Sequence, residues 1–252
     1  MNPADALLQT HLAQLKLAYV QEHYQSLADQ AAQQHWTPVD YLSRLMEGEA
    51  LRQMDRTVRR RIVAARFPVL KTLEQFNWSW PKKINRPQIQ NLFRLAFLEN
   101  HANVIFMGGV GLGKTHLAVA LGYAACQQQH TVLYATAVEV VNTLLAAQAT
   151  HSLPDALKRY RRPRLLILDE LGYLPIDKAG ADLLFQVFSQ RYERGSTLIT
   201  TNQAYKNWLR IFNNDSTSTS AVLDRLLHHA ETILIEGSSY RMKDQIKTEE
   251  PS

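Results

Sequence analysis

The stretch that most constrains the fold of this chain runs from Gly108 to Thr115 and reads GGVGLGKT. It fits the pattern G-x-x-x-x-G-K-[ST], which predicts a loop that turns its backbone amides toward the phosphates of a nucleotide. Glycine at Gly108, Gly111 and Gly113 permits positive φ angles, which this turn needs. We expect Lys114 to contact the β- and γ-phosphates of ATP, and Thr115 to offer its hydroxyl to Mg²⁺.

The residues on either side of this loop supply the context that the motif requires. Residues 103–107 read as a short buried strand, and residues 116–129 read as a helix that is apolar nearly all round. The positive end of that helix would point at the same phosphates. The predicted ATP site therefore comprises Gly108, Gly109, Val110, Gly111, Leu112, Gly113, Lys114, Thr115 and His116.

Beyond the loop, the chain alternates between predicted strands and predicted helices. Short apolar runs read as buried strands, and longer segments with a helical apolar stripe lie between them. This alternation predicts an α/β fold with a parallel sheet, whose strand ends face one ligand crevice. We expect strands at 131–136, 165–170, 196–200 and 232–235, helices at 138–149, 178–194 and 221–229, and a polar loop at 215–220.

Two carboxylates follow the apolar strand that begins at Leu165, on the same sheet edge as the phosphate loop. Asp169 is expected to hold Mg²⁺, mostly through water, and Glu170 to polarise the water that attacks the γ-phosphate. The plainer alternative is a solvated pair that ends a strand and caps the next segment of the chain. Asn202 follows the next strand, where it would hydrogen-bond the attacking water or the γ-phosphate, or serve only as a turn residue.

The N-terminal region reads as helical, with helices over 4–34 and from Thr37-Pro38 to a point before Pro68. Another helix is expected from Arg86 through Leu98, and Phe76, Trp78 and Trp80 are expected to cover an edge of the core.

Basic residues gather in two stretches of the chain. They either neutralise nucleic-acid phosphates or form ordinary solvated helix faces, and the net charge of +5 permits a nucleic-acid partner without requiring one. The candidates for DNA contact are Arg56, Arg59, Arg60, Arg61 and Arg66 in the first stretch, and Lys158, Arg159, Arg161 and Arg162 in the second.

Composition excludes several classes of protein. Cys126 is the single cysteine, so neither a disulfide framework nor a cysteine zinc site is possible. No apolar run reaches the ~18 residues of a membrane span, and we expect no signal peptide. His228 and His229 have no partner cluster in the sequence, so no chemistry is assigned to them.

Several stretches together resemble one family closely: GGVGLGKTHLAVALG, LLILDELGYLP, LLFQVFSQRYERGSTLITTN, AVLDRLLHHAE and GSSYRMK. The resemblance is to the IstB-like ATPases of insertion sequences, in the AAA+ group that includes DnaC-type helicase loaders, and it covers essentially the whole chain. It implies a P-loop NTPase of the AAA+ type with a parallel central sheet, an N-terminal helical module over 1–70 and an ATPase domain over 71–252. Because few residues follow Arg241 in this sequence, we expect no helical lid.

The same resemblance implies a function. It implies a protein of the bacterial cytoplasm that oligomerises on double-stranded DNA, hydrolyses ATP with Mg²⁺, and recruits and stimulates an IstA-type transposase. Matched by motif, Lys114 and Thr115 belong to Walker A, Asp169 and Glu170 to Walker B, Asn202 to sensor 1, Arg225 to the arginine finger and Arg241 to a sensor-2-like position. Thr201-Asn202 departs from the commoner Ser-Asn. The alternatives are a helicase loader, a small-molecule kinase and a nucleotide-gated adaptor that hydrolyses ATP slowly.

Overall fold

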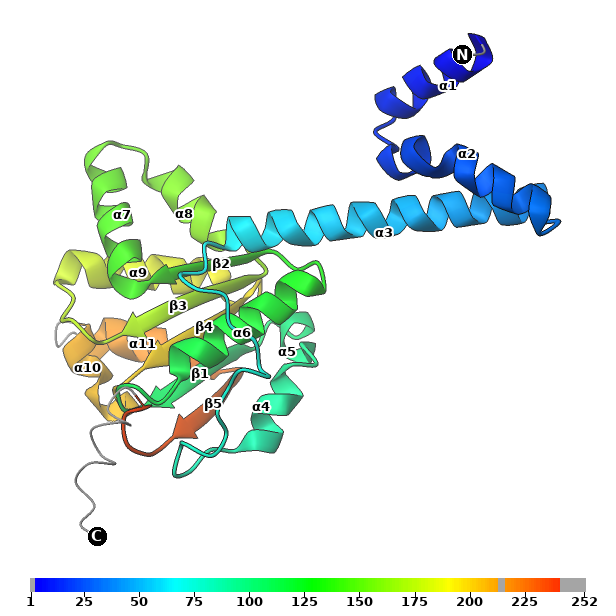
Figure 1. Cartoon of the computed structure of the whole chain (residues 1–252). Coiled ribbons are helices and arrows are strands. Elements are labelled where there is room, and N and C mark those ends of the chain that lie inside the picture. Colours follow the sequence, from blue (N-terminus) through cyan, green and yellow to red (C-terminus); the bar gives the residue numbers. More distant parts are fainter. Residues whose placement is uncertain (1–2, 213–215, 241–252) are drawn as a thin grey trace. The chain divides into compact units, whose positions relative to one another are not determined.

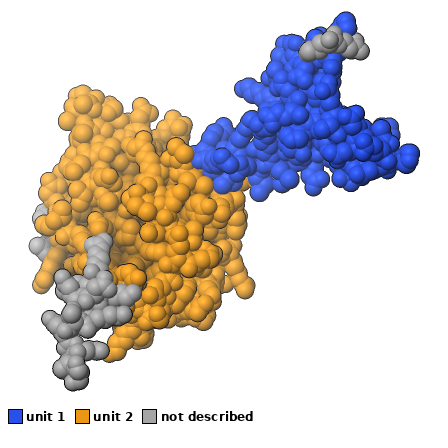
Figure 2. Space-filling model, viewed as in Figure 1, with its two compact units in different colours: residues 1–60 blue, residues 61–252 orange. Residues whose placement is uncertain are grey.

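A computed structural model of the chain describes residues 3–212 and 216–240. For residues 216–218 it describes the backbone alone. The chain forms two compact units, residues 1–60 and 61–252, coloured separately in Figure 2. The functional division at residue 70 stays a prediction. Within the described part of the chain, no helix combines the length and the apolar character needed to cross a membrane.

The first unit contains α1 (Pro3–Gln14), α2 (Ala18–Gln33) and most of α3 (Pro38–Ala65). The helical character predicted for residues 4–34 is confirmed except for a break near Lys16, whose φ of 58° is left-handed. The interruption lets α1 and α2 pack on each other and on α3 through a small core of Leu12, Val20 and Leu45.

The start of α3 is capped by reciprocal hydrogen bonds between Thr37 and Asp40. The Asp40 amide donates to the Thr37 hydroxyl at 3.2 Å, and the Thr37 amide donates to the Asp40 carboxylate at 3.1 Å. Further along α3, the buried Glu49 carboxylate accepts hydrogen bonds from the amides of Tyr19 and Val20, at 2.7 and 3.3 Å. Glu49 therefore satisfies the amides at the beginning of α2 and does not belong to a solvated face.

The second unit is built on a five-stranded sheet in the order β2-β3-β4-β1-β5, and every neighbouring pair is parallel (Figure 1). The predicted α/β architecture is confirmed. The strand carrying the phosphate loop lies between β4 and β5, and the strand carrying the two carboxylates lies between β2 and β4. The strands are β1 (Asn103–Gly108), β2 (Val132–Thr136), β3 (Leu165–Leu171), β4 (Ser196–Thr201) and β5 (Ala230–Ile235).

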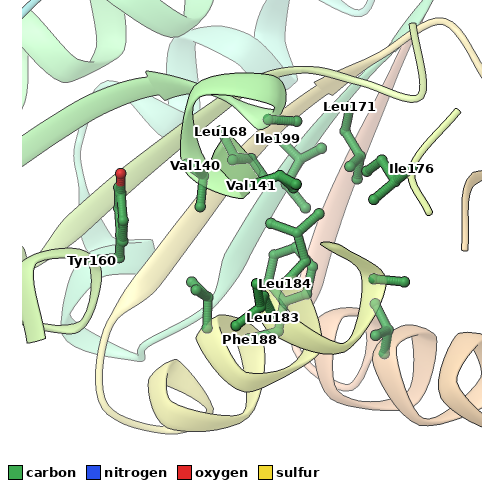
Figure 3. Packing of buried hydrophobic residues seen from close by; sticks show 14 of the residues in the cluster. Val140, Val141, Tyr160, Leu168, Leu171, Ile176, Leu183, Leu184, Phe188 and Ile199 are labelled. Carbon is green, nitrogen blue, oxygen red and sulfur yellow. The ribbon is translucent and has the colours of Figure 1, made fainter. Parts of the chain in front are cut away.

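Helices cover both faces of this sheet, because successive strand residues point to opposite sides. Ile105 and Ile199 belong to the core shared with α7, α8, α9 and α11 (Figure 3), whereas Val104 and Leu198 belong to the core shared with α4, α5 and α6. The helices are α4 (Arg86–Leu92), α5 (Ala96–Glu99), α6 (Lys114–Gln127), α7 (Ala137–Ala149), α8 (Leu153–Arg161), α9 (Lys178–Arg191), α10 (Trp208–Ile211) and α11 (Ser216–Leu227), with a 3-10 turn at Tyr205–Asn207.

Two predicted segments are wrong. The single helix expected from Arg86 to Leu98 is divided into α4 and α5 at Leu95, whose φ is 61°. The polar loop expected at 215–220 lies mostly within α11, which begins at Ser216, while residue 215 itself is outside the described residues. Serine and threonine disfavour helix interiors locally, but burial of Val222 and Leu226 against the core stabilises the whole helix.

Candidate nucleotide site

The phosphate loop lies between the end of β1 and the start of α6, beside a cavity of about 600 Å³. Gly111 and Gly113 have φ angles of 74° and 87°, so they need the conformational freedom that the sequence predicted. The wall formed by the loop comprises Val110, Gly111, Leu112, Gly113, Lys114, Thr115 and His116.

Gly108 is required for a different reason from the one predicted. Gly108 is described, but it is not one of the glycines with a positive φ angle. A Cβ atom there would instead lie 2.1 Å from the carbonyl oxygen of Ile235, at the end of β5. Glycine therefore permits close approach of two parallel strands at the base of the loop.

The Lys114 side chain is folded back under the loop and buried. Its ammonium donates hydrogen bonds to the carbonyl oxygens of Gly108 and Gly109, at 2.8 and 2.6 Å. These carbonyls hold a charged group at the entrance to α6, where a helix N-terminus favours an anion. The arrangement places the ammonium within the loop that the sequence predicts to surround phosphate.

Asp169 and Thr115 are in direct contact. The Thr115 hydroxyl lies 3.0 Å from both carboxylate oxygens of Asp169, which is itself almost fully buried. Two more hydroxyls donate to the same carboxylate: Tyr134 from β2, at 2.6 Å, and Thr200 from β4. Burial and the hydrogen bond to Asp169 raise the pKa of Tyr134, so this phenol stays protonated as a donor.

Glu170 differs from its neighbour in backbone and exposure. Its φ of 61° is left-handed, and the pairing of β3 with β4 shifts register between Leu168 and Leu171. Its amide donates to the Thr200 hydroxyl at 2.9 Å, and its exposed side chain lines the cavity. The irregular backbone thus turns the two adjacent carboxylates to different places, one buried and one facing the cavity.

These residues fit Mg²⁺. The hydroxyl of Thr115 and the carboxylate of Asp169 are oxygen ligands, which Mg²⁺ prefers, and it commonly retains several waters beside one or two carboxylates. The 3.0 Å separation of their oxygens suits neighbouring positions around one small cation.

Asn202 lies one residue beyond Thr201, which pairs with Met107 of β1 and with Leu171 of β3. This register places Asn202 between the C-terminal end of β1, which leads into the phosphate loop, and the C-terminal end of β3, which directly follows Glu170. Its Oδ1 atom is buried and has no hydrogen-bond partner among the described residues. Buried polar atoms are normally hydrogen-bonded, so this oxygen is available to accept a hydrogen bond from a ligand or water.

The structure does not bring Arg225 to this cavity within one chain. Its guanidinium donates to the Ala221 carbonyl at 3.0 Å, lies 5.0 Å from the Phe185 ring centroid, and borders a hollow with Asn103 and Thr197. Those two residues lie at the N-terminal ends of β1 and β4. The phosphate loop follows the C-terminal end of β1, about 16 Å away along the strand. No described carboxylate is within ion-pairing distance of Arg225.

The sequence interpretation missed a wall of the cavity formed by segments distant from the motif. The Trp80 indole donates to the Ser238 carbonyl at 2.9 Å and meets the Tyr240 ring edge-on at 5.3 Å. The Tyr240 amide in turn donates to the Gly111 carbonyl at 2.9 Å. The two tryptophans Trp78 and Trp80 were the available signal in the sequence. The additional lining residues include Pro68, Val69, Lys71, Phe76, Trp80, Pro81 and Tyr240.

His116 anchors this wall to α6. Its Nε2 lies 2.9 Å from the Thr72 carbonyl, as a donor, and its ring meets Phe76 edge-on at 5.4 Å. Burial lowers the pKa of His116, and nearby Lys71 lowers it further. The imidazole is therefore neutral near pH 7, in keeping with its single partner carbonyl.

The basic candidates lie on α3 and α8 or directly after the ends of these helices. Arg56, Arg59 and Arg60 belong to the first unit, and Arg59 forms an ion pair of 2.9 Å with Asp55. Arg61 and Arg66 belong to the second unit, where the Nε of Arg61 is buried. The second stretch is exposed on α8 and at its end: Lys158, Arg159, Arg161 and Arg162. Arg241 lies outside the described residues.

The expectation that His228 and His229 lack a partner cluster is wrong. Glu193 joins them, so that one potential ligand atom from each of the three residues lies within 4.8 Å of the others. The sequence separation between the turn after α9 and the end of α11 concealed this proximity.

Solved structures confirm the fold. The DnaC helicase loader aligns with a TM-score of 0.54 and 22% identity, over 66% of this chain and 96% of that one. AMPPCP-bound DnaA from Aquifex aeolicus aligns with a TM-score of 0.55 and 19% identity, over 73% of this chain and 56% of that one. At such identities the likeness concerns the fold alone.

Sequence relatives identify the family. The chain is 38% identical over 240 residues to the ATP-binding protein of insertion sequence IS21 from Pseudomonas aeruginosa, covering 95% of this chain and 90% of the relative. It is 36% identical over 242 residues to that of insertion sequence IS232 from Bacillus thuringiensis subsp. berliner, covering 96% of each. A family model described as IstB-like ATP binding protein matches residues 10–248. The chain therefore belongs to the family of IstB-like ATP-binding proteins of insertion sequences.

Proposed function

We propose that this protein is an ATPase that assists the transposition of an insertion sequence. In this proposal it oligomerises on double-stranded DNA, hydrolyses ATP to ADP and phosphate, and recruits and stimulates a partner transposase. The observation that carries the ATPase assignment is the 3.0 Å contact between Thr115 and Asp169, beside a cavity that Lys114 and Glu170 also line.

Phosphate binding requires Lys114 to change partners. Its ammonium now donates to the carbonyls of Gly108 and Gly109, and the β- and γ-phosphates of ATP would replace one or both. Mg²⁺ held by Thr115 and Asp169 would neutralise charge on the β- and γ-oxygens. The hydroxyls of Tyr134 and Thr200 fix the Asp169 carboxylate, so its orientation is set before ATP arrives.

Glu170 is the candidate base. Its carboxylate faces the cavity, and its amide is held by Thr200, the same residue that donates to Asp169. Glu170 would orient and polarise a water for in-line attack on the γ-phosphate. The unsatisfied Oδ1 of Asn202 is a suitable acceptor for a proton of that water.

The cavity wall that contains Trp80 and Tyr240 is suited to binding the base of the nucleotide. Val69 and Tyr240 are 60% and 44% exposed, although they line a cavity together with Trp80. Apolar and aromatic surface left open in a cavity favours a planar ring, which stacks well on aromatic side chains.

The assignment to transposition rests on the relatives, whose names place them in insertion sequences. The exposed basic residues of α8 support DNA contact, because cations at that density neutralise backbone phosphates. The position of Arg225, remote from the cavity of its own chain, supports an oligomer in which it serves the neighbouring site.

A DnaC-type helicase loader is the second candidate, favoured by the fold similarity to DnaC. The two candidates share the ATP site and differ in partner. The test is retention of purified full-length protein, with ATP, on an immobilised transposase of its own insertion sequence or on an immobilised replicative helicase. Retention by the transposase supports the first proposal, and retention by the helicase alone overturns it in favour of the second.

ATP turnover with and without duplex DNA tests the enzymatic part. We expect steady hydrolysis that duplex DNA accelerates, and loss of that hydrolysis in Glu170→Gln. A wild-type protein that binds ATP and does not turn it over with DNA or the partner present would instead be a nucleotide-gated adaptor.

A further inference from the structure

We propose that Glu193, His228 and His229 form a site for a divalent transition-metal ion of the zinc type, separate from the ATP cavity. One ligand atom from each residue lies within 4.8 Å of the other two. Glu193 follows the end of α9, and the two histidines follow the end of α11. The site thus joins two helices that pack on the same face of the sheet.

The donor set selects the class of metal. Two imidazole nitrogens and one carboxylate oxygen suit Zn²⁺, Co²⁺, Ni²⁺ or Cu²⁺, whereas Mg²⁺ and Ca²⁺ prefer oxygen alone. Three protein ligands also leave at least one position for water or another group. The Mg²⁺ expected beside ATP would therefore not compete effectively for this position.

The backbone that carries the histidines is fixed on both sides. The His228 amide donates to the Asp224 carbonyl at 3.0 Å, and the His229 carbonyl accepts from the Asn103 amide at 2.7 Å. The ring centroids of the two histidines lie 4.1 Å apart. This anchoring to α11 and β1 limits the ordering that metal binding would need.

Tyr192 supplies an outer contact of the kind that orients metal-bound histidines. Its hydroxyl lies 3.0 Å from Nδ1 of His228. When Nδ1 carries the proton and donates to this oxygen, Nε2 keeps its lone pair for the metal.

The three side chains must move only slightly. Tetrahedral ligand atoms around Zn²⁺, at bonds of about 2.0–2.1 Å, lie about 3.4 Å apart. All three side chains are exposed, so rotation about their side-chain bonds can close the remaining separation.

The test is titration of the full-length protein, without nucleotide, with Co²⁺ followed by visible absorption and with Zn²⁺ followed by calorimetry. We expect about one ion per chain, and at least about tenfold weaker binding in each of Glu193→Gln, His228→Gln and His229→Gln. Tyr192→Phe, which keeps all three ligands, should weaken binding by about tenfold. His11→Gln, which removes an exposed histidine of α1, is the matched control and should bind as the wild type does.

Circular dichroism and thermal unfolding of each variant without metal separate loss of the site from loss of the fold. The proposal is overturned by wild-type protein that takes up no ion at micromolar concentration. It is equally overturned if the three ligand variants, correctly folded, bind as tightly as His11→Gln does. Neither outcome depends on ATP turnover, so the failure of this site would leave the ATPase proposal intact.

Discussion

The Tyr134 hydroxyl donates a hydrogen bond of 2.6 Å to Oδ2 of Asp169, from the strand next to the one that carries Asp169. Thr200 donates to Oδ1 from the strand on the other side, and Thr115 reaches both oxygens from α6. The carboxylate is therefore fixed by three hydroxyls from three elements. Its orientation is a property of the sheet and does not depend on a bound nucleotide.

Tyr134→Phe should reduce ATP turnover about tenfold, with little change in the affinity for ATP alone. The hydroxyl orients the carboxylate that would hold Mg²⁺ in the proposed site, and a hydrogen bond to a charged group contributes about 1.5–3 kcal/mol. Turnover measured against Mg²⁺ concentration should show a higher requirement for the ion. Tyr205→Phe is the matched control, because it removes a hydroxyl bonded at 2.6 Å to Thr232, away from the cavity. Equal turnover in both variants would show that Tyr134 only stabilises the fold.

Lys114→Ala should weaken ATP binding strongly, whereas Glu170→Gln should bind ATP almost as the wild type does and lose turnover. Lys114 would contact phosphates in the ground state, and Glu170 would act on water in the transition state. Titration with a fluorescent ATP analogue measures the affinities. A similar loss of affinity in both variants would contradict these separate roles.

Arg225 should act on the ATP bound by a neighbouring subunit. Arg225→Ala retains a complete cavity, and Glu170→Gln retains the guanidinium, so mixed oligomers on DNA should recover ATPase activity that neither variant shows alone. An arginine supplied to a P-loop site contributes about 10³–10⁵ in rate. Arg210→Ala, an exposed arginine of α10, is the control for lost charge. Co-assembly without recovery would assign Arg225 a structural role.

DNA binding should weaken with salt less steeply when the α8 cluster is neutralised. The substitutions Lys158→Gln, Arg161→Gln and Arg162→Gln remove three exposed cations. Each lost phosphate contact lowers the slope of log K against log salt by about 0.9. Neutralising Lys178, Arg194 and Lys206, which are also exposed, is the matched control. Neutralising Arg56 and Arg60 on α3 measures how much the first cluster contributes to the salt dependence. An unchanged slope after neutralising the α8 cluster would assign the DNA contact to α3.

The stability of the protein should fall more steeply below pH 6.5 in the wild type than in His116→Gln. Burial lowers the pKa of His116 from the ordinary 6.5, so the folded state binds fewer protons than the unfolded state. The stabilising contribution is present above pH 6.5 and is lost as the pH falls toward the folded pKa. Urea unfolding between pH 8 and pH 5 measures the difference, and parallel curves for the two proteins would exclude it.

The sequence by itself determined the strand, loop and helix around Gly108–Thr115 and the strands that alternate with helices. These features are local: glycine spacing, a lysine and threonine at fixed positions, and apolar runs whose period defines the element. Prediction from the sequence failed where the local preference of residues and the tertiary packing disagree, as in the serine- and threonine-rich start of α11. The same limit explains the unpredicted breaks at Lys16 and Leu95, both left-handed without glycine.

Only the tertiary structure decided which distant side chains meet. Tyr134 reaches Asp169 because β2 lies beside β3, and Trp80 meets Tyr240 because two segments far apart in the chain flank one loop. Glu193 meets His228 because α9 and α11 pack on one face of the sheet. Strand order and helix packing minimise the free energy of the whole core, so residues brought together in this way leave no fixed spacing in the sequence.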